Sequence, residues 1–311
     1  MEITINALLT VVGLVLLCFG GNWLVSGGVS IAKKLRISQM VIGLTVVAYG
    51  TSTPELAASV AASLGSHTDL ILGNIVGSNI SNVGMVIGIS AIISPLVVSK
   101  ATTRKEVPIM IGVMLLLVAM SIDGEISQYD GVLLIAGLIA FTVYTVSRAK
   151  KERKKEEEDT SAQKSSMPKA VGLVAIGSGL LYLGGYLTIE NVVSIAQSIG
   201  VSETVVGITI VAIGTSLPEL ITSLIAIKKG HTDIGIGNIV GSNIYNILMI
   251  MGVASVITGI AVVPEIFNDY IIMIGFAVVV IAFLRSGIIP RAAGIGLAIA
   301  YAVYLGYTLL L

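Results

Sequence analysis

The sequence predicts an all-α integral membrane protein, because its composition is apolar, it contains ten long apolar stretches and it carries an internal repeat. The chain has 311 residues, of which 55% are hydrophobic and 12% charged, and its mean hydropathy is +0.99. A soluble domain cannot bury that much apolar surface, so a lipid bilayer must solvate most of it. The 35 glycines agree with this, because glycine is frequent in transmembrane helices and lets them pack closely. The net charge of zero gives no indication of nucleic-acid binding.

Ten apolar stretches are long enough to cross a bilayer as helices. They lie at about 5–32, 40–64, 70–97, 106–122, 130–147, 169–189, 204–227, 234–260, 267–284 and 288–310. The first and sixth stretches exceed about 20 residues, which predicts that these helices are tilted. No basic segment or cleavage pattern precedes the first stretch, so we interpret the chain from Met1 as a mature helix rather than a signal peptide.

The basic residues predict how these helices are oriented. If the N-terminus lies outside, all 18 Lys and Arg residues fall in cytoplasmic segments. These segments contain Lys33, Lys34 and Arg36; Lys100, Arg104 and Lys105; the run from Arg148 to Lys169; Lys228 and Lys229; and Arg285 and Arg291. The positive-inside rule favours this arrangement. We therefore expect a multi-pass protein of the cytoplasmic membrane with both termini external.

An internal repeat predicts the domain organisation. Residues 41–94 align with 205–258 without a gap at an offset of 164, and 28 of the 54 positions are identical. Each half holds five predicted helices, an odd number, so the second half must cross the membrane upside down. Inverted repeats of this kind are typical of transporters, with the substrate site near the middle of the bilayer. We predict a first five-helix repeat at 1–147 and a second, inverted one at 169–311.

A charged segment, residues 148–168, links the two halves. We interpret it as a solvated, partly helical cytoplasmic linker. A regulatory or lipid-binding role is the alternative, because a polybasic stretch near a membrane attracts anionic lipids. The acidic run that directly follows the basic residues weakens this alternative.

Glu55 and Glu219 are the only acidic residues well inside predicted spans, each in the motif Gly-Thr-Ser-x-Pro-Glu. A carboxylate in the bilayer is costly and indicates a functional site. Proline cannot donate a backbone hydrogen bond, so Pro54 frees the carbonyl of Gly50, and Pro218 has the same effect in the second copy. We expect the helix to open there and to turn backbone carbonyls and Thr and Ser hydroxyls toward the glutamate. Carboxylate and neutral oxygen ligands favour Ca²⁺ over softer metals.

A second repeated motif, Gly-Asn-Ile-Val-Gly-Ser-Asn, places polar side chains four residues apart on one helix face. The stripes are Asn74, Ser78 and Asn82 in the first half and Asn238, Ser242 and Asn246 in the second. Such a stripe suits neutral ligation of a cation. It also suits hydrogen bonding between helices, and for Asn74 and Asn238 the sequence leaves both interpretations open.

The paired motifs closely resemble the α-repeats of the sodium/calcium exchanger family, over nearly the whole chain. The resemblance implies that Glu55 and Glu219 share a Ca²⁺ site, that Ca²⁺ and Na⁺ are transported, and that no cofactor is needed. The remaining ligands of these ions would come from Thr51, Thr215, Ser52, Ser216, Ser78 and Ser242, the carbonyls of Ala48 and Ala212, and Asn82 in the central position. Prokaryotic members can carry Asp where this chain has Asn246, which leaves two intramembrane carboxylates rather than three. The large calcium-sensing loop of eukaryotic members is missing.

The predicted function is therefore antiport, in which a site that is neutralised by Ca²⁺ or by several Na⁺ ions changes the face to which it is open. A proton/calcium antiporter of the same superfamily is the first alternative, because two carboxylates can also carry protons. A channel is the second, although inverted repeats favour alternating access. A membrane enzyme is the third, but no nucleophile–base pair or metal-ligand cluster supports it. No obligate protein partner is evident beyond the ions and the lipid bilayer.

Overall fold

The structure is a computed structural model that describes residues 2–65, 68–98, 102–156, 166–201, 212–284 and 287–309. The chain is mostly helical, and six of the described helices are long and apolar enough to cross a membrane. These are Ile3–Leu35, Ile71–Ile93, Gln128–Lys151, Met167–Ser198, Thr232–Ile257 and Ile266–Phe283. Two antiparallel sheets of two short strands each depart from the purely helical prediction.

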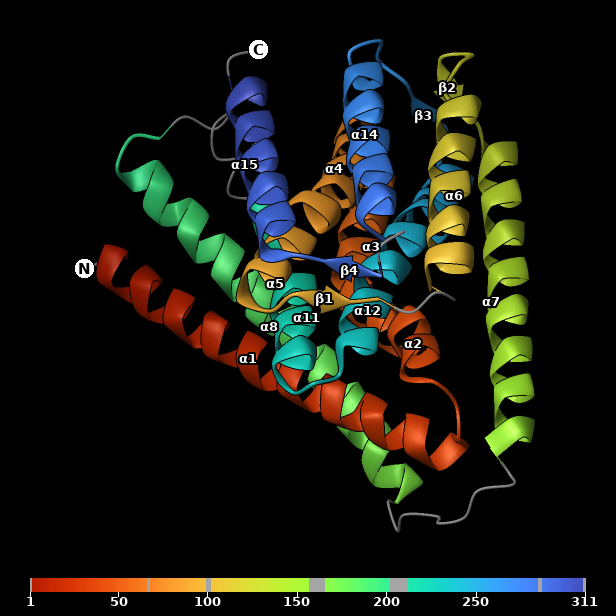
Figure 1. The fold of residues 1–311 in the computed structure, drawn as a ribbon. Helices are drawn as coiled ribbons and strands as arrows, with labels where there is room; N and C mark the ends of the chain where they lie inside the picture. The colour runs from red at the N-terminus through yellow and green to blue at the C-terminus, as the bar shows by residue number, and fades with distance from the viewer. Residues whose placement is uncertain are drawn as a thin grey trace.

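The elements of the first part of the chain appear in Figure 1 from red to yellow-green. They are α1 (Glu2–Leu35), α2 (Gln39–Ile42), the π-helical segment η1 (Gly43–Val47), α3 (Ala48–Leu64), α4 (Thr68–Ser81), the π-helical segment η2 (Asn82–Ile87), α5 (Gly88–Ile93), β1 (Leu96–Val97), the π-helical segment η3 (Thr102–Glu106), α6 (Val107–Met120), β2 (Glu125–Ile126) and α7 (Gln128–Glu156).

The second part repeats this order. Its elements are α8 (Met167–Ser198), α10 (Ala212–Thr215), α11 (Leu217–Lys228), α12 (Thr232–Tyr245), the π-helical segment η5 (Asn246–Met251), α13 (Gly252–Ile257), β3 (Ile260–Ala261), α14 (Ile266–Leu284), β4 (Ile288–Ile289) and α15 (Arg291–Thr308). The bounds of α12, η5 and α13 equal those of α4, η2 and α5 plus 164. The sequence repeat is thus also a repeat of local structure, including its π-helical turns.

Helix covers most of each predicted apolar stretch within the described residues, although 204–227 is described only from Ala212. Two helices extend well beyond the apolar stretch, because α7 runs to Glu156 and α8 to Ser198. Lys, Arg, Glu and Gln are good helix formers, so helix can continue where the apolar residues end. The third stretch, expected to reach 97, ends as helix at Ile93, since the residue before Pro95 is disfavoured in helical geometry.

Equivalent elements of the two parts each pack against an element of the other part. Strand β1 pairs with β4, while β2 pairs with β3, and β1 and β3 are equivalent at the offset of 164. Helix α5 packs against α15, while its counterpart α13 packs against α7. Such an exchange is what a two-fold relation between two similar halves produces.

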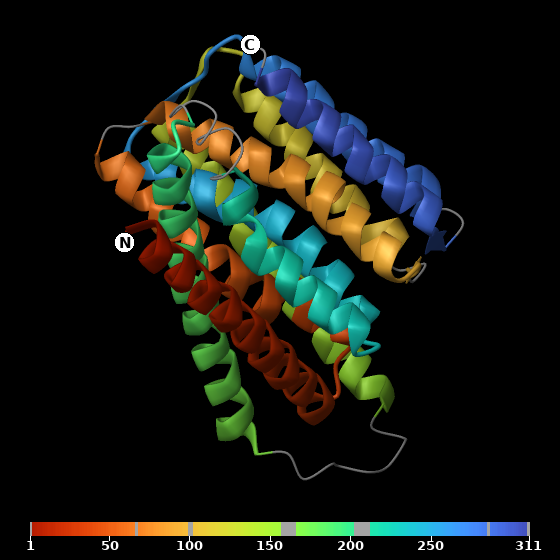
Figure 2. The ribbon, with the colours of Figure 1, turned by 90° about the vertical axis from the view of Figure 1, so that its left-hand side faces the viewer.

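Helices α1 and α8 cross at one side of the molecule and touch through their backbones (Figures 1 and 2). Their glycines are seven residues apart, so they share one helix face. A Cβ added at Gly13, Gly20 or Gly27 of α1 would lie 2.8 Å from a carbonyl oxygen of α8. Likewise, a Cβ at Gly177 or Gly184 of α8 would lie 2.8 or 2.7 Å from a carbonyl oxygen of α1. The pair therefore depends on small residues, as close helix contacts in membranes generally do.

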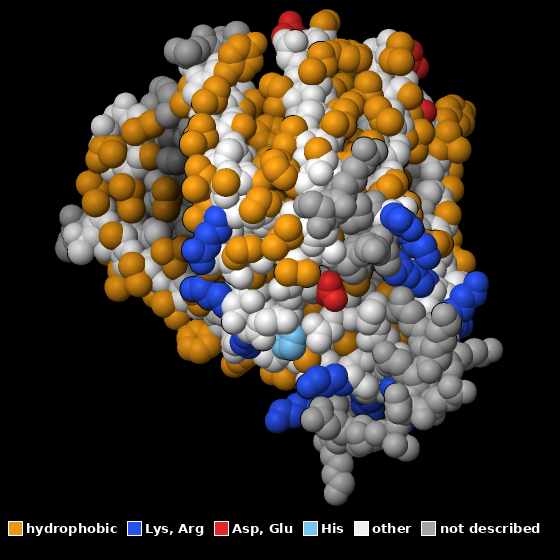
Figure 3. Space-filling view, in the orientation of Figure 1, with side chains coloured by type: hydrophobic (Ala, Val, Ile, Leu, Met, Phe, Trp, Pro, Cys, Tyr) orange, Lys and Arg blue, Asp and Glu red, His pale blue; other side chains and the backbone are white. Residues whose placement is uncertain are grey.

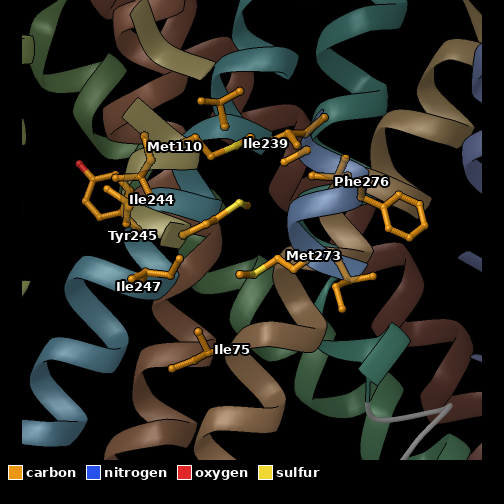
Figure 4. Close-up of a cluster of buried hydrophobic side chains, with 14 of the residues drawn as sticks. Ile75, Met110, Ile239, Ile244, Tyr245, Ile247, Met273 and Phe276 are labelled. Carbon is orange, nitrogen blue, oxygen red and sulfur yellow. The ribbon is translucent and has the colours of Figure 1, made fainter. Parts of the chain in front are cut away.

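The buried apolar side chains form two clusters. The larger one lies among the remaining helices and includes Met110, Ile239, Tyr245 and Met273 (Figure 4). The smaller one joins α1 and α8 to the rest of the protein and includes Leu17, Leu24, Val47, Ala170, Leu181, Ala226 and Ile234. The crossed pair thus packs on the main body through its own set of contacts.

The surface agrees with a membrane environment. Figure 3 shows apolar side chains over most of the visible face, with Lys and Arg gathered toward its lower half. Many large apolar side chains are exposed, among them Leu8 and Val11 on α1 and Val132 on α7. A membrane-spanning helix presents such side chains to lipid.

We predict that Gly184→Ala destabilises the protein, because the added methyl group would force the α1 and α8 backbones apart. Overpacking of this kind typically costs about 1–3 kcal/mol, which will appear as a lower melting temperature in detergent. Gly179→Ala on the same helix is the matched control, since a Cβ there meets nothing within 4 Å. Equal melting temperatures for the two variants would contradict the close packing.

Candidate ion-binding site

The fold places both glutamates in one buried location. Glu55 lies in α3 and Glu219 in the first turn of α11, and their side chains are 3% and 0% exposed. The helices α3 and α11 contact each other. Although 164 residues separate the two glutamates in the sequence, the hydroxyl of Ser52, about one turn before Glu55 on α3, lies 3.3 Å from Oε1 of Glu219.

The backbone opens at only one of the two Gly-Pro segments. In the second half the helix is interrupted at Ser216, between α10 and α11. In the first half α3 continues unbroken through Pro54, so the opening predicted there is wrong. Pro218 stands in the first turn of α11, where a backbone N–H has no helical partner to lose. Pro54 lies inside α3 and costs that helix a hydrogen bond without ending it.

Thr51 joins the two halves of the site. Its hydroxyl oxygen lies 3.2 Å from the carbonyl oxygen of Ala48, to which it can donate within α3. The same oxygen lies 3.0 Å from Oδ1 of Asn238 and 3.3 Å from the hydroxyl of Ser242, both on α12. Thr51 is fully buried, so these polar contacts replace water.

Ser52 reaches the second glutamate. Its hydroxyl lies 3.3 Å from Oε1 of Glu219 and 3.2 Å from the hydroxyl of Ser242. Ser242 also donates to Oε1 of Glu219, at 3.3 Å. One oxygen of Glu219 is therefore held by a hydroxyl from each half of the chain.

Asn238 connects three helices through its amide group. Its Nδ2 donates to the hydroxyl of Ser223 at 3.0 Å and to the backbone carbonyl of Glu219 at 3.4 Å, both on α11. Its Oδ1 lies within hydrogen-bond distance of Thr51 on α3. Both ends of the amide are thus used between helices, which favours the interhelical interpretation for this residue. Asn74, its counterpart in α4, is half-buried.

Several buried oxygens of the site have no hydrogen-bond partner among the described residues. They are both carboxylate oxygens of Glu55, Oε2 of Glu219, the hydroxyls of Ser78 and Ser216, and Oδ1 of Asn82 and Asn246. Buried polar groups are normally satisfied, and an exception needs an explanation. The ion pair shown by the structure, Arg148 with Glu106, involves neither site glutamate. Unpaired oxygens around two carboxylates are the ligands that a hard cation requires.

The two predicted central residues begin π-helical segments. Asn82 is the first residue of η2 and Asn246 the first of η5, and both are buried. Nδ2 of Asn246 donates to Oδ1 of Asn79 at 3.2 Å. Single π-helical turns inside α-helices are frequent at functional sites.

The remaining predicted ligands lie on α10. Thr215 is half-buried, while Ala212 is the first residue of that helix and its side chain lies outside the described set. The sequence did not single out Ser223 or the buried pair Asn79 and Asn243. Asn79 and Asn243 occupy equivalent positions, and Ser223 is matched by Ser59, so both positions are identical in the two repeats; this identity is the signal that could have identified them.

Helices that carry apolar side chains on their outer surface, around buried carboxylates and unpaired oxygens, define a multi-pass membrane protein of the cation-antiporter class. The pattern of the family described as sodium/calcium exchanger protein matches residues 5–147 and 169–310. The chain belongs to the sodium/calcium exchanger family.

Relatives match along almost the whole chain. The sodium/calcium exchanger MaX1 of Methanosarcina acetivorans is 30% identical, over 97% of this chain and 98% of its own. The inner membrane protein YrbG of Escherichia coli K12 is 32% identical, over 96% and 94%. A solved structure of the sodium-calcium exchanger NCX_Mj, soaked without Na⁺ and Ca²⁺, has a TM-score of 0.84 and 31% identity, over 98% of this chain and 99% of its own.

We predict that neutralising either glutamate removes the stabilisation of the fold by Ca²⁺. A ligand at about 100 times its dissociation constant adds about 2.7 kcal/mol to the stability of a protein. Glu55→Gln or Glu219→Gln should lose most of this, because each removes half of the negative charge that holds the ion. The measurement is the melting temperature in detergent with and without Ca²⁺.

Glu265→Gln is the control for this experiment, because Glu265 is an exposed acidic residue before α14. It should keep the full Ca²⁺-dependent shift. A full shift in either site variant would show that the carboxylates do not hold the ion.

Proposed function

We propose that the protein exchanges Na⁺ for Ca²⁺ across the cytoplasmic membrane by alternating access around Glu55 and Glu219. The observation that carries this proposal is that two buried glutamates on packed helices carry unpaired carboxylate oxygens, and neither forms an ion pair with a basic residue in the described part of the chain. The names of the relatives support it, since MaX1 is called a sodium/calcium exchanger and NCX_Mj a sodium-calcium exchanger.

The proposed membrane arrangement is ten spanning helices in two inverted repeats of five, with both termini external. The repeat at an offset of 164, the sorting of all 18 basic residues and the exchange of contact partners support it. In this arrangement residues 148–168 form the cytoplasmic linker.

The proposed ligands follow the two repeated motifs. Ca²⁺ lies between Glu55 and Glu219, and the hydroxyls and carbonyls beside them complete this position and the Na⁺ positions. They come from Thr51, Ser52, Ala48, Ser78 and Asn82 in the first half and from Thr215, Ser216, Ala212, Ser242 and Asn246 in the second. The ion displaces the weaker contacts among the hydroxyls that the structure shows around Glu219.

Electrostatics explains why such a site exchanges ions rather than leaks them. Enclosing two unpaired carboxylates in an apolar surrounding is costly. A bound Ca²⁺, or several Na⁺, neutralises them and lowers that cost, so the loaded site changes face readily. The empty, doubly negative site does so much more slowly. Helices α1 and α8 are the proposed moving elements, since they pack against the main body as a crossed pair with their own apolar cluster.

A proton/calcium antiporter is the second candidate, because two buried carboxylates can each carry a proton. The hydroxyls around Glu219 favour Na⁺, since Thr51, Ser52 and Ser242 supply neutral oxygens that a proton carrier does not need. The two candidates differ in the gradient that drives Ca²⁺ uptake.

We predict that ⁴⁵Ca²⁺ accumulates in proteoliposomes loaded with Na⁺ when external Na⁺ is replaced by a large organic cation. A pH gradient of equal size without Na⁺ should drive little uptake. Uptake driven by the pH gradient alone would favour the proton antiporter. Glu55→Gln should reduce the Na⁺-driven flux to the level of empty liposomes.

A further inference from the structure

The short turn between α11 and α12 makes polar contacts that the proposed function does not use. Lys229 in this turn donates from Nζ to Oδ1 of Asn22 at 2.5 Å and to the hydroxyl of Ser26 at 3.1 Å, both on α1. His231 in the same turn lies with Nδ1 3.0 Å from Oε1 of Gln39, the first residue of α2. The turn therefore contacts the chain on both sides of the α1–α2 connection.

The charge in this contact belongs to Lys229. Burial, with the neighbouring Lys33 and Lys229, lowers the pKa of His231, so its ring is neutral near pH 7. An ammonium group that donates to two neutral oxygens makes charge-assisted hydrogen bonds, which are stronger than neutral ones. We call the contact of Lys229 with Asn22 and Ser26 the α1 latch.

The latch lies at the contact between α1 and α11, the helix that carries Glu219. A Cβ added at Gly21 of α1 would lie 3.1 Å from the side chain of Ile225 and 3.3 Å from that of Thr222. Thr222 is three residues after Glu219, which is about one turn of α11. Helix α1 is thus packed tightly over α11 between the latch and the site.

The equivalent position in the other half lacks both features. At the offset of 164, Gly65 corresponds to Lys229, and Tyr186 and Glu190 correspond to Asn22 and Ser26. Glycine has no side chain with which to form a latch on α8. The packing differs too, because a Cβ at Gly185, the counterpart of Gly21, would meet only Pro218, at 3.7 Å. The latch and the close packing at Gly21 therefore both hold α1 against α11. Neither feature has a counterpart at the equivalent positions of α8.

We propose that Lys229 is a positioning residue that holds α1 against α11 and so favours the state of the exchanger that is closed on the Lys229 face. This inference rests on the proposed function, in which α1 and α8 move over the site. In the proposed cycle both faces open in turn, and the latch adds a preference for one of them. A transport cycle with such a preference has different apparent Ca²⁺ affinities on its two faces.

The test compares Lys229→Met with Lys228→Met. Lys228 is the neighbouring exposed lysine at the end of α11, so both variants remove one positive charge from the same turn. A cysteine at Ile225→Cys, in a Cys18→Ser background, reports on the interface between α1 and α11. We expect Lys229→Met to raise the rate of labelling by a soluble maleimide about two- to fivefold, the range for one exposed charged contact. Lys228→Met should leave the rate unchanged.

Asn22→Leu removes one of the two acceptors of the latch, the one nearer to Nζ of Lys229. It should raise the labelling rate as Lys229→Met does, and the double variant should add little, because both changes break one contact. Additive effects, or equal labelling of the Lys228 and Lys229 variants, would overturn the proposal. Melting temperatures, measured in parallel, show whether a variant has lost its fold. If Lys229→Met were not folded, the labelling rates of Asn22→Leu and Lys228→Met would be compared instead, and equal rates would overturn the proposal.

Transport supplies the second readout. In proteoliposomes, Lys229→Met should lower the half-saturating Ca²⁺ concentration on the Lys229 face, because this face opens more often in the variant. The half-saturating concentration on the opposite face should rise. A residue that only stabilised the fold would change the melting temperature and the maximal rate without this opposite shift. Labelling needs no transport, so the labelling rate tests the latch even if Na⁺-driven exchange is absent. Absent exchange with an increased labelling rate would overturn the proposed function alone.

Discussion

The structure depends on two carboxyl groups that share one buried position inside an apolar protein. Glu55 and Glu219 repel each other when both are ionised, and neither forms an ion pair with a basic side chain in the described part of the chain. Water cannot solvate them from the bilayer, which is why we propose that a cation does. The unpaired oxygens of Glu55 and the unpaired Oε2 of Glu219 agree with this requirement, while Oε1 of Glu219 is paired with the hydroxyls of Ser52 and Ser242.

The internal repeat solves a geometric problem. One motif, used twice, brings two equivalent glutamates to one place, and Glu219 receives a hydroxyl contact from Ser52 of the other half. The exchange of partners between strands β1 to β4 shows that the same relation reaches the ends of the helices. The departures from the repeat are as informative as the repeat itself. The helix breaks at Ser216 but continues through Pro54, so the two halves of the site differ in backbone geometry.

Much of the fold was predictable from the sequence, because in a membrane apolar length and charge placement constrain the helices directly. The glutamates were predictable for the same reason, since a carboxylate within a span has few roles. The π-helical turns at Asn82 and Asn246 were not, because nothing local distinguishes them from α-helix. The bridging role of Asn238 was left open for a related reason. Its partners, Thr51 and Ser223, lie on other helices, and only tertiary packing brings them together.

The crossed helices α1 and α8 explain how a neutralised site could change face at low cost. Glycine surfaces let two backbones touch without interlocking side chains, so the pair can move as one body. Its apolar cluster is separate from the larger core, so its displacement leaves that core intact. Apolar contact is non-directional, and sliding exchanges one such contact for another. A directional polar contact is different, because sliding breaks it outright. A charged hydrogen-bonding group on one face would therefore bias the proposed movement toward one of its two ends.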